Sequence, residues 1–261
     1  TFRHIRILQI GPRPFDFWST MCNGGELLEK FGVELAPVPL PELTAEVRRA
    51  IEEGDAVRET IAYCRENMEI RITDEQLQNV AGLAVAMERL IEKYHCNAGA
   101  IQCWNALQND SGLGVMPCMV NGLLIEDGIP VTCETDLHGA VTAILLQEAA
   151  DRCSAIFFSD LTVRHPTNDN AELLWHCGNF SPSLADPTEE KKLGRHFIFP
   201  SHKCGTGEWK IRNGEVTVCR FDGDHGDYHL FIGEGRGTDP VRVVRISGWR
   251  WKIGRSGNVP W

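Results

Sequence analysis

The chain has 261 residues, of which 43% are hydrophobic and 24% are charged, and its formal net charge is -10. These proportions are ordinary for a globular protein with one large or two ordinary domains. No apolar run approaches the ~20 residues of a membrane helix and no signal peptide opens the sequence, so we expect a cytoplasmic protein with no membrane partner. The acidic balance argues against a nucleic-acid partner, because phosphate binding needs a basic face.

The ten cysteines are scattered along the chain. They form no C-x-x-C pair and no zinc-binding spacing. Several lie in apolar strand or helix contexts, where cysteine behaves as a small hydrophobic residue. We therefore expect reduced thiols rather than a disulfide framework, and a redox or zinc protein built on the cysteines has little support.

The chain opens with alternating strand and helix patterns. A strand over residues 4–10 enters a proline-rich turn, a helix over residues 16–31 ends at a glycine, and a second strand covers residues 33–38. Because the chain starts at Thr1 and enters a strand almost at once, we expect it to begin within a longer protein. The fingerprint G-x-G-x-x-G is absent after the first strand, which disfavours a dinucleotide cofactor.

Helical patterns then continue for some fifty residues. Thr44 caps a helix that is interrupted at Gly54. Thr73-Asp74-Glu75-Gln76 is a capping box, which begins a long amphipathic helix that extends to about His95. A buried strand over residues 98–102 follows, and polar side chains lie at its carboxyl end.

The centre of the chain concentrates the candidate chemistry. A strand over residues 130–133 leads to Glu134, a helix covers residues 136–150, and a second strand over residues 154–158 leads to Asp160. A right-handed crossover makes these two strands parallel neighbours. Their carboxyl ends then open on the same edge of the sheet, where α/β proteins bind ligands.

A histidine completes this set, because His176 follows Asp160 by 16 residues. Two carboxylates and one imidazole predict a divalent-metal site, and such a donor set suits Mn²⁺, Mg²⁺ or Fe²⁺ about equally. Asp136, His138 and His165 compete as ligands, although the first two are also explained as a helix-dipole partner and a surface residue. Either carboxylate alone is often no more than a helix cap.

After residue 166 the pattern changes to polar turns and short strand-like runs. Asn213-Gly214 predicts a hairpin between residues 209–212 and 215–218. A further strand-like run covers residues 241–246.

These patterns predict the fold class and the domain organisation. We expect an α/β protein with a mainly parallel α/β sheet domain over residues 1–165, which carries the acidic site. A smaller β-rich domain over residues 166–261, either a barrel or a curled sheet, follows it.

Several short motifs can be compared with known proteins. They are Ile10-Gly11-Pro12-Arg13-Pro14, Phe31-Gly32-Val33-Glu34, Cys103-Trp104-Asn105, GIPVTCETDLHGA at residues 128–140, Phe158-Ser159-Asp160, Leu174-Trp175-His176, and the segment from Gly205-Thr206-Gly207 to Arg236. Together they resemble the middle and third domains of the L-fucose isomerase/L-arabinose isomerase family. The resemblance covers nearly the whole chain and is most specific around Glu134.

The resemblance implies a metal-dependent aldose–ketose isomerase that works through a metal-stabilised enediolate, usually with Mn²⁺ and otherwise with another divalent cation such as Mg²⁺. Glu134 and Asp160 match the positions that bind the metal and move the proton in that family. His176 matches a further metal ligand of the arabinose-isomerase branch. We assign Glu134 as the base that transfers the proton between C2 and C1 of an open-chain sugar.

Sugar contacts and an assembly are also expected. Gln102, Trp104 and Asn105 lie at a strand's carboxyl end, and together with His202 they are the predicted sugar-binding residues. The resemblance implies a homo-oligomer, a hexamer by analogy. By this resemblance we expect the given sequence to correspond to the family without its N-terminal domain and without a C-terminal segment that carries a further metal-binding histidine. A non-catalytic sugar-binding or regulatory fragment with an isomerase-like fold is the alternative.

Overall fold

The computed structural model describes residues 4–109, 113–196 and 203–238, together with the backbone of residues 252–255. The α/β part consists of β1 (Arg6–Ile10), the 3-10 helix η1 (Trp18–Thr20), α1 (Gly24–Phe31), β2 (Glu34–Val38), α2 (Leu40–Glu53), α3 (Asp55–Asn67), β3 (Glu69–Ile70), α4 (Asp74–Lys93), β4 (Ala98–Ile101), α5 (Ala106–Asn109), α6 (Cys118–Glu126), β5 (Val131–Thr132) and α7 (Leu137–Ala149). The β-rich part consists of β6 (Asp160–Arg164), β7 (Ala171–Trp175), the 3-10 helix η2 (Pro182–Leu184), β8 (Lys192–Arg195), β9 (Cys204–Glu208), β10 (Gly214–Asp224), β11 (Asp227–Thr238) and β12 (Lys252–Arg255).

The α/β part is built on a parallel sheet with the strand order β2-β1-β4-β5. This sheet confirms the predicted fold class. The chain passes from β1 to β2 on one side, and β4 and β5 are added on the other side. Such a reversal of strand order opens a crevice at the carboxyl ends of the two central strands, where α/β proteins bind ligands. The switch point of this sheet lies between β1 and β4.

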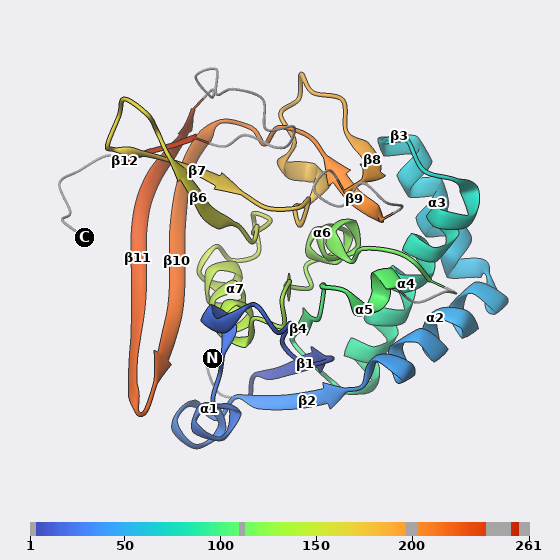
Figure 1. Ribbon diagram of the computed structural model, residues 1–261, viewed down its shortest axis with the longest axis horizontal. Coiled ribbons are helices and arrows are strands. Elements are labelled where there is room, and N and C mark those ends of the chain that lie inside the picture. Colours follow the sequence, from blue (N-terminus) through green and yellow to red (C-terminus); the bar gives the residue numbers. More distant parts are fainter. Residues whose placement is uncertain (1–3, 110–112, 197–202, 239–251, 256–261) are drawn as a thin grey trace.

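Helices cover both faces of the parallel sheet (Figure 1). Successive side chains of a strand point to opposite faces, and β1 follows this rule. Leu8 and Ile10 belong to a core that they share with α2, α4 and α6, whereas Ile7 packs with Leu27 of α1 and Val141 of α7. All of these side chains are buried. The sheet is therefore the middle layer of a three-layer α/β/α arrangement.

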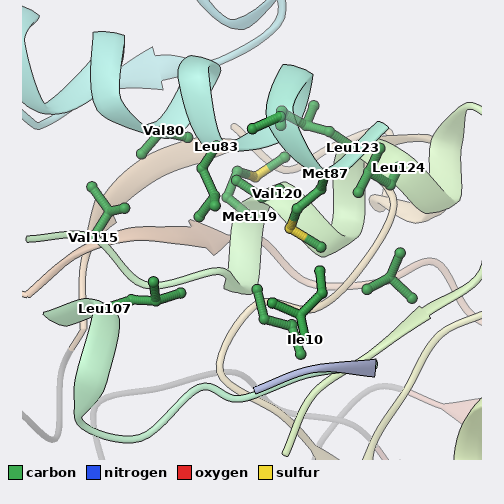
Figure 2. Close-up of a cluster of buried hydrophobic side chains, with 14 of the residues drawn as sticks. Ile10, Val80, Leu83, Met87, Leu107, Val115, Met119, Val120, Leu123 and Leu124 are labelled. Carbon is green, nitrogen blue, oxygen red and sulfur yellow. The ribbon is translucent and has the colours of Figure 1, made fainter. Parts of the chain in front are cut away.

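The larger core lies between α4, α6 and the sheet. Figure 2 shows the side chains of α4 facing those of α6, with Ile10 of β1 below them. Burying a leucine or methionine side chain contributes about 1.5–3 kcal/mol to stability, so this contact is a main source of stability for the part of the fold that supports the sheet. The facing residues are Val80, Leu83 and Met87 of α4, and Met119, Val120, Leu123 and Leu124 of α6.

Local sequence signals explain several helix ends. The capping box is confirmed. The backbone N–H of Gln76 donates to Thr73 Oγ1 at 3.2 Å, and the backbone N–H of Thr73 donates to Gln76 Oε1 at 3.1 Å. The predicted break at Gly54 is confirmed as well. Gly54 has φ of +81°, a left-handed conformation that favours glycine, and it ends α2.

Two helix starts were predicted wrongly. The helix expected over residues 16–31 is only α1, because Asn23 accepts a hydrogen bond from the Glu26 amide and caps the helix there. The residues before Asn23 form a loop with the short η1. Helix α2 begins at Leu40 rather than after Thr44, because proline is accepted in the first turn of a helix.

The β-rich part contains two further sheets. A five-stranded sheet has the order β10-β11-β12-β7-β6, and its pairings are antiparallel. A three-stranded sheet joins β8 and β9 to β3, so the α/β part contributes a strand to it. The predicted β-rich second part is confirmed, whereas the domain boundary after residue 165 stays a prediction.

The hairpin predicted at Asn213-Gly214 is wrong. β10 begins at Gly214 and pairs with β11 across the turn at His225 and Gly226, so Gly214 lies opposite Gly237. The preceding residues instead approach η2, because Ile211 forms an isolated bridge with Ala185. The sequence motif fits a tight turn, but long-range pairing with β11 outweighs this local preference. The long β10–β11 hairpin stands beside α7 (Figure 1).

Two further findings concern predictions about the chain as a whole. No helix in the described residues is long and apolar enough to cross a membrane. All ten cysteines are free thiols. The strand-like run predicted over residues 241–246 lies outside the described residues.

Candidate metal and sugar site

The loops that follow β1, β4 and β5 meet at the carboxyl edge of the parallel sheet. The backbone N–H of Gln102 donates to the Ile10 carbonyl at 2.8 Å, and the backbone N–H of Thr135 donates to the Ile101 carbonyl at 3.1 Å. Gly11, with φ of +73°, lies so close to Gln102 that a Cβ atom at residue 11 would be 2.7 Å from Gln102 Oε1. The glycine after β1 therefore lets the two central loops approach each other at the switch point.

Glu134 lies in a turn whose backbone conformation glutamate and threonine rarely adopt. Glu134 and Thr135 have φ of +62° and +51°, and each non-glycine residue in this region costs of order 1–3 kcal/mol. Hydrogen bonds hold the turn: Thr135 Oγ1 donates to the Pro12 carbonyl at 3.1 Å, and Thr20 Oγ1 donates to the Glu134 carbonyl at 3.3 Å. Strain of this kind gathers at functional sites, and here it orients a buried glutamate.

Asp160 reaches the site by a route that differs from the predicted one. Residues 154–158 are not a strand of the parallel sheet, and only Phe157 forms an isolated antiparallel bridge, with Phe180. Asp160 is the first residue of β6, which pairs antiparallel with β7 so that Asp160 lies opposite Trp175. The predicted parallel crossover is therefore wrong. The hairpin instead places Asp160 beside the residue before His176.

Glu134, Asp160 and His176 nevertheless come together. One ligand atom from each residue lies within 4.8 Å of the others, and in the described residues this is the only such group of three or more His, Cys, Asp or Glu side chains. Glu134 Oε1 lies 3.8 Å from His176 Nε2. The Phe158 ring packs edge-on against the imidazole, with ring centroids 5.2 Å apart. Glu134 and His176 are buried, whereas Asp160 is open to solvent.

The electrostatics of the three groups are coupled. Burial raises the pKa of Glu134, and the nearby His176 only partly offsets this effect. The protein that surrounds the Asp160 carboxylate raises its pKa as well, although the residue as a whole is exposed. Burial lowers the pKa of His176, but the neighbouring Glu134 together with the negative charges of Cys177 and Asp160 outweighs burial and raises the pKa to about 9. The raised pKa values therefore favour the protonated forms of these three side chains when no cation is bound.

The residues fit a divalent cation by the chemistry of their donors. Carboxylate and imidazole are the ligands of Mn²⁺ and related ions, at about 2.0–2.2 Å for small divalent cations. Both ring nitrogens of His176 are buried, and among the described residues neither has a hydrogen-bond partner, since Glu134 Oε1 is 3.8 Å from Nε2. Such buried atoms are costly unless another species satisfies them. The ligand atoms need to move toward each other only slightly to contact one ion.

The competing ligands have other roles. Asp136, which was expected to be a helix-dipole partner inside the first turn, is the N-cap of α7. Its Oδ1 atom accepts a hydrogen bond from the Gly139 backbone amide at 2.8 Å, and the same carboxylate pairs with Arg220 of β10. His138 is buried rather than on the surface, because β10 covers α7 and brings Asp222 Oδ1 to 3.1 Å from His138 Nδ1. His165 is not part of the group around Glu134.

The predicted sugar contacts are only partly placed. Gln102 lies at the switch point, and its Oε1 atom is buried with no hydrogen-bond partner among the described residues. The Trp104 ring packs edge-on against Phe17, with centroids 5.5 Å apart. Asn105 Oδ1 accepts a hydrogen bond from Lys203 Nζ at 3.2 Å. His202 lies outside the described residues.

Sequence reasoning missed the loop after β1 as a part of this site. Thr20 contacts the backbone of Glu134, and Phe17 packs on Trp104. The proline-rich composition of the loop signals a turn, but no local pattern indicates that it folds back over the carboxyl edge of the sheet.

Comparison with known proteins gives the reaction class of the relatives. No protein-family model matches the chain. A sulfoquinovose isomerase of Priestia aryabhattai is 28% identical over 236 residues, which cover 90% of this chain and 51% of the relative. A sulfoquinovose isomerase of Alkalicoccus urumqiensis is 29% identical over 254 residues, covering 97% and 55%. A sulfoquinovose isomerase of Clostridium sp. (strain MSTE9) is 29% identical over 246 residues, covering 90% and 52%.

The chain thus spans about half the length of the curated relatives it matches. By their names, these relatives are sugar isomerases, the reaction class that the sequence motifs also suggest. Membership of the L-fucose/L-arabinose isomerase family itself stays a prediction.

Proposed function

We propose that the chain carries the metal-binding and proton-transferring part of an aldose–ketose isomerase. The observation that carries the proposal is the meeting of Glu134, Asp160 and His176 at the carboxyl edge of the sheet. These residues come from two different sheets, and fold stability alone does not require two carboxylates and an imidazole to face one another. Similarity to sulfoquinovose isomerases supports the same reaction class.

Glu134 acts as the base that takes the proton from C2 of the open-chain sugar and returns it to C1. A base works best when its pKa lies near the working pH, and burial raises the pKa of Glu134 above the usual glutamate value. The strained turn and its hydrogen bonds to Thr20 and Pro12 fix the backbone that carries the carboxylate. The partly exposed Asp160 exchanges protons with the sugar hydroxyl groups and with solvent.

Glu134, Asp160 and His176 together would hold the cation, with Mn²⁺ as the first candidate and Mg²⁺ as the second. When bound, a divalent cation supplies positive charge that stabilises the oxygen on which negative charge develops. Buried Gln102 Oε1 has no hydrogen-bond partner in the part of the chain that the structure describes, and it accepts a hydrogen bond from a sugar hydroxyl group. Trp104 and Asn105 line the same edge and contact the sugar beside it. We expect a homo-oligomer, as the family resemblance implies.

The substrate proposed first is sulfoquinovose, an aldohexose with a sulfonate in place of the 6-hydroxyl group. The test is conversion of sulfoquinovose, D-glucose, L-fucose and L-arabinose by the purified chain with and without Mn²⁺, followed by NMR. Metal-dependent conversion of at least one aldose is expected. Mn²⁺ binding without conversion of any of the four sugars contradicts the isomerase and favours a sugar-binding module.

The Glu134→Gln variant tests directly whether Glu134 is the base. The amide keeps the size of the side chain but is not a base, so conversion falls by at least about 100-fold. Glu148→Gln is the matched control, because Glu148 lies on α7 and its exposed side chain pairs only with Arg152 in the described structure. Equal activity in both variants is incompatible with Glu134 as the base.

A further inference from the structure

An arginine is held in a fixed position in the loop that follows β1. Arg13 Nη1 donates to three backbone carbonyls of this loop at 3.0–3.1 Å, and the acceptors are Pro14, Phe15 and Phe17. Its guanidinium also lies over the Trp18 ring, with Cζ 5.4 Å from the ring centroid. The side chain is only partly buried, so the loop positions a positive charge that solvent and solutes can reach.

A short series of contacts links this arginine to the candidate site. The Phe17 carbonyl oxygen is 3.1 Å from Arg13 Nη1 and 3.0 Å from Thr20 Oγ1. Thr20 Oγ1 in turn lies 3.3 Å from the Glu134 carbonyl oxygen. The Phe17 ring packs on Trp104, one of the predicted sugar contacts. The guanidinium is therefore no more than three hydrogen-bond lengths from the backbone of the proposed base.

One edge of the Arg13 guanidinium has no acceptor in the part of the chain that the structure describes. Arginine carries five N–H donors, and only those of Nη1 meet an acceptor there. The remaining atoms, Nε and Nη2, form the fork with which arginine binds the oxygens of an anion. Arg6 uses these same two atoms on the Glu34 carboxylate, at 2.7 and 2.5 Å.

The charges around the site decide where an anion can bind. The chain has a net charge of -10, and the carboxylates of Glu134 and Asp160 repel a negative group, so an anionic substrate needs a local positive charge. Arg220 already contacts two carboxylates, those of Asp136 and Asp222. Among these groups, Arg13 is the cation that has no carboxylate partner in the described residues.

We propose that Arg13 binds an anionic group at the far end of the sugar and thereby determines the specificity of the isomerase. This inference rests on the proposed function, in which the metal site acts on C1 and C2. Sulfoquinovose carries its sulfonate on C6, at the opposite end of the carbon chain, and the sulfonate oxygens suit the fork of Nε and Nη2. Three hydrogen-bond lengths are comparable with the length of an extended six-carbon chain. D-glucose has a neutral hydroxyl group on C6 and gives Arg13 no charged partner.

The test compares kcat/KM of the purified chain with Mn²⁺ for sulfoquinovose, D-glucose and glucose 6-phosphate. We expect the unaltered chain to prefer sulfoquinovose. Arg13→Met should lower the ratio of kcat/KM for sulfoquinovose to that for D-glucose by at least about tenfold, because a hydrogen bond between charged groups is lost. The loss should appear mainly as a higher KM for sulfoquinovose. Arg13→Lys keeps the charge without the fork, so it should retain part of the preference.

A matched control and a measurement on the unaltered chain separate this role from support of the loop. Arg65 lies on α3, and its exposed side chain pairs with Asp74 at 2.9 Å. Arg65→Met removes an equal charge and should leave the ratio unchanged. Added KCl should raise KM for sulfoquinovose but not for D-glucose, because salt screens the attraction between the two charges. This arm still decides the question if Arg13→Met does not fold.

Several outcomes overturn the proposal. An equal loss with both sugars in Arg13→Met would mean that Arg13 only supports the loop. A preference that is lost in Lys203→Met and kept in Arg13→Met assigns the sulfonate to Lys203, which lies beside Asn105. A greater preference for glucose 6-phosphate identifies a phosphate and contradicts the sulfonate.

Failure of the proposed function gives a different result. In that case the unaltered chain converts none of the three sugars, and calorimetric titration with sulfoquinovose decides the role of Arg13. Binding that weakens at least about tenfold in Arg13→Met supports the assignment. Equal binding in the two proteins, or no binding to either, overturns it.

Discussion

The ion pair between Arg220 and Asp136 links the β-rich part to the helix that follows Glu134. Arg220 Nη1 contacts Asp136 Oδ2, and the Asp136 side chain is only 3% exposed. Arg220→Ala leaves that carboxylate buried with the Gly139 amide as a remaining partner. Breaking a buried pair from one side costs about 3–5 kcal/mol.

The expected cost is smaller here for two reasons. The Arg220 side chain is 31% exposed, and Asp136 retains its capping hydrogen bond. We therefore predict that Arg220→Ala lowers the free energy of unfolding by about 2–3 kcal/mol. Asp136→Asn keeps the capping oxygen and removes the charge, and it should cost only about 1 kcal/mol. In the Asp136→Asn background, Arg220→Ala should therefore cost about 1 kcal/mol or less.

Urea unfolding of the four proteins measures this cycle, with midpoint and slope fitted together. The prediction is a coupling free energy of at least about 1 kcal/mol between the two residues. If Arg220→Ala costs the same in both backgrounds, the buried charge of Asp136 is not what Arg220 stabilises. A cost below about 0.5 kcal/mol in the unaltered background would mean that the pair behaves as an exposed one.

Further predictions concern the core, a close backbone contact and acid stability. Leu83→Ala should lower the unfolding free energy by about 2–5 kcal/mol in urea, because it empties a fully buried position; a loss under 1 kcal/mol contradicts the packing. Gly122→Ala should cost about 1–3 kcal/mol, because its Cβ would overlap the Phe180 carbonyl, and unchanged stability refutes that contact. Hydrogen bonds from Thr188, then Lys210, lower the pKa of Asp186 to about 2. Its stabilisation is therefore present above pH 4 and lost as the pH falls toward 2, and Asp186→Asn should lack that part of the acid transition.

Patterns that act over a few residues predicted the fold most accurately. The Thr73–Gln76 capping box and the glycine at residue 54 fix helix ends through contacts within one turn. The strands and helices of the α/β part follow from apolar periodicity, since each must bury one face or both. The start of α1 was missed because Asn23, a capping residue, competes with a helical pattern that begins earlier.

The route of the chain to the site was harder to predict. Residues 154–158 have the apolar run of a buried strand, yet Asp160 belongs to an antiparallel hairpin with β7. An apolar run does not specify its pairing partner, which depends on contacts distant in sequence. The site residues could nevertheless be predicted, because carboxylate and imidazole side chains are metal ligands whichever strand pairing brings them together.

The most direct test of the metal site is anomalous diffraction at the manganese edge from crystals of the chain grown with Mn²⁺. We expect one strong peak in contact with Glu134, Asp160 and His176, at distances of about 2.0–2.3 Å. A peak at another place, or bound Mn²⁺ that leaves these three side chains pointing apart, would contradict the proposed metal site and the isomerase that depends on it.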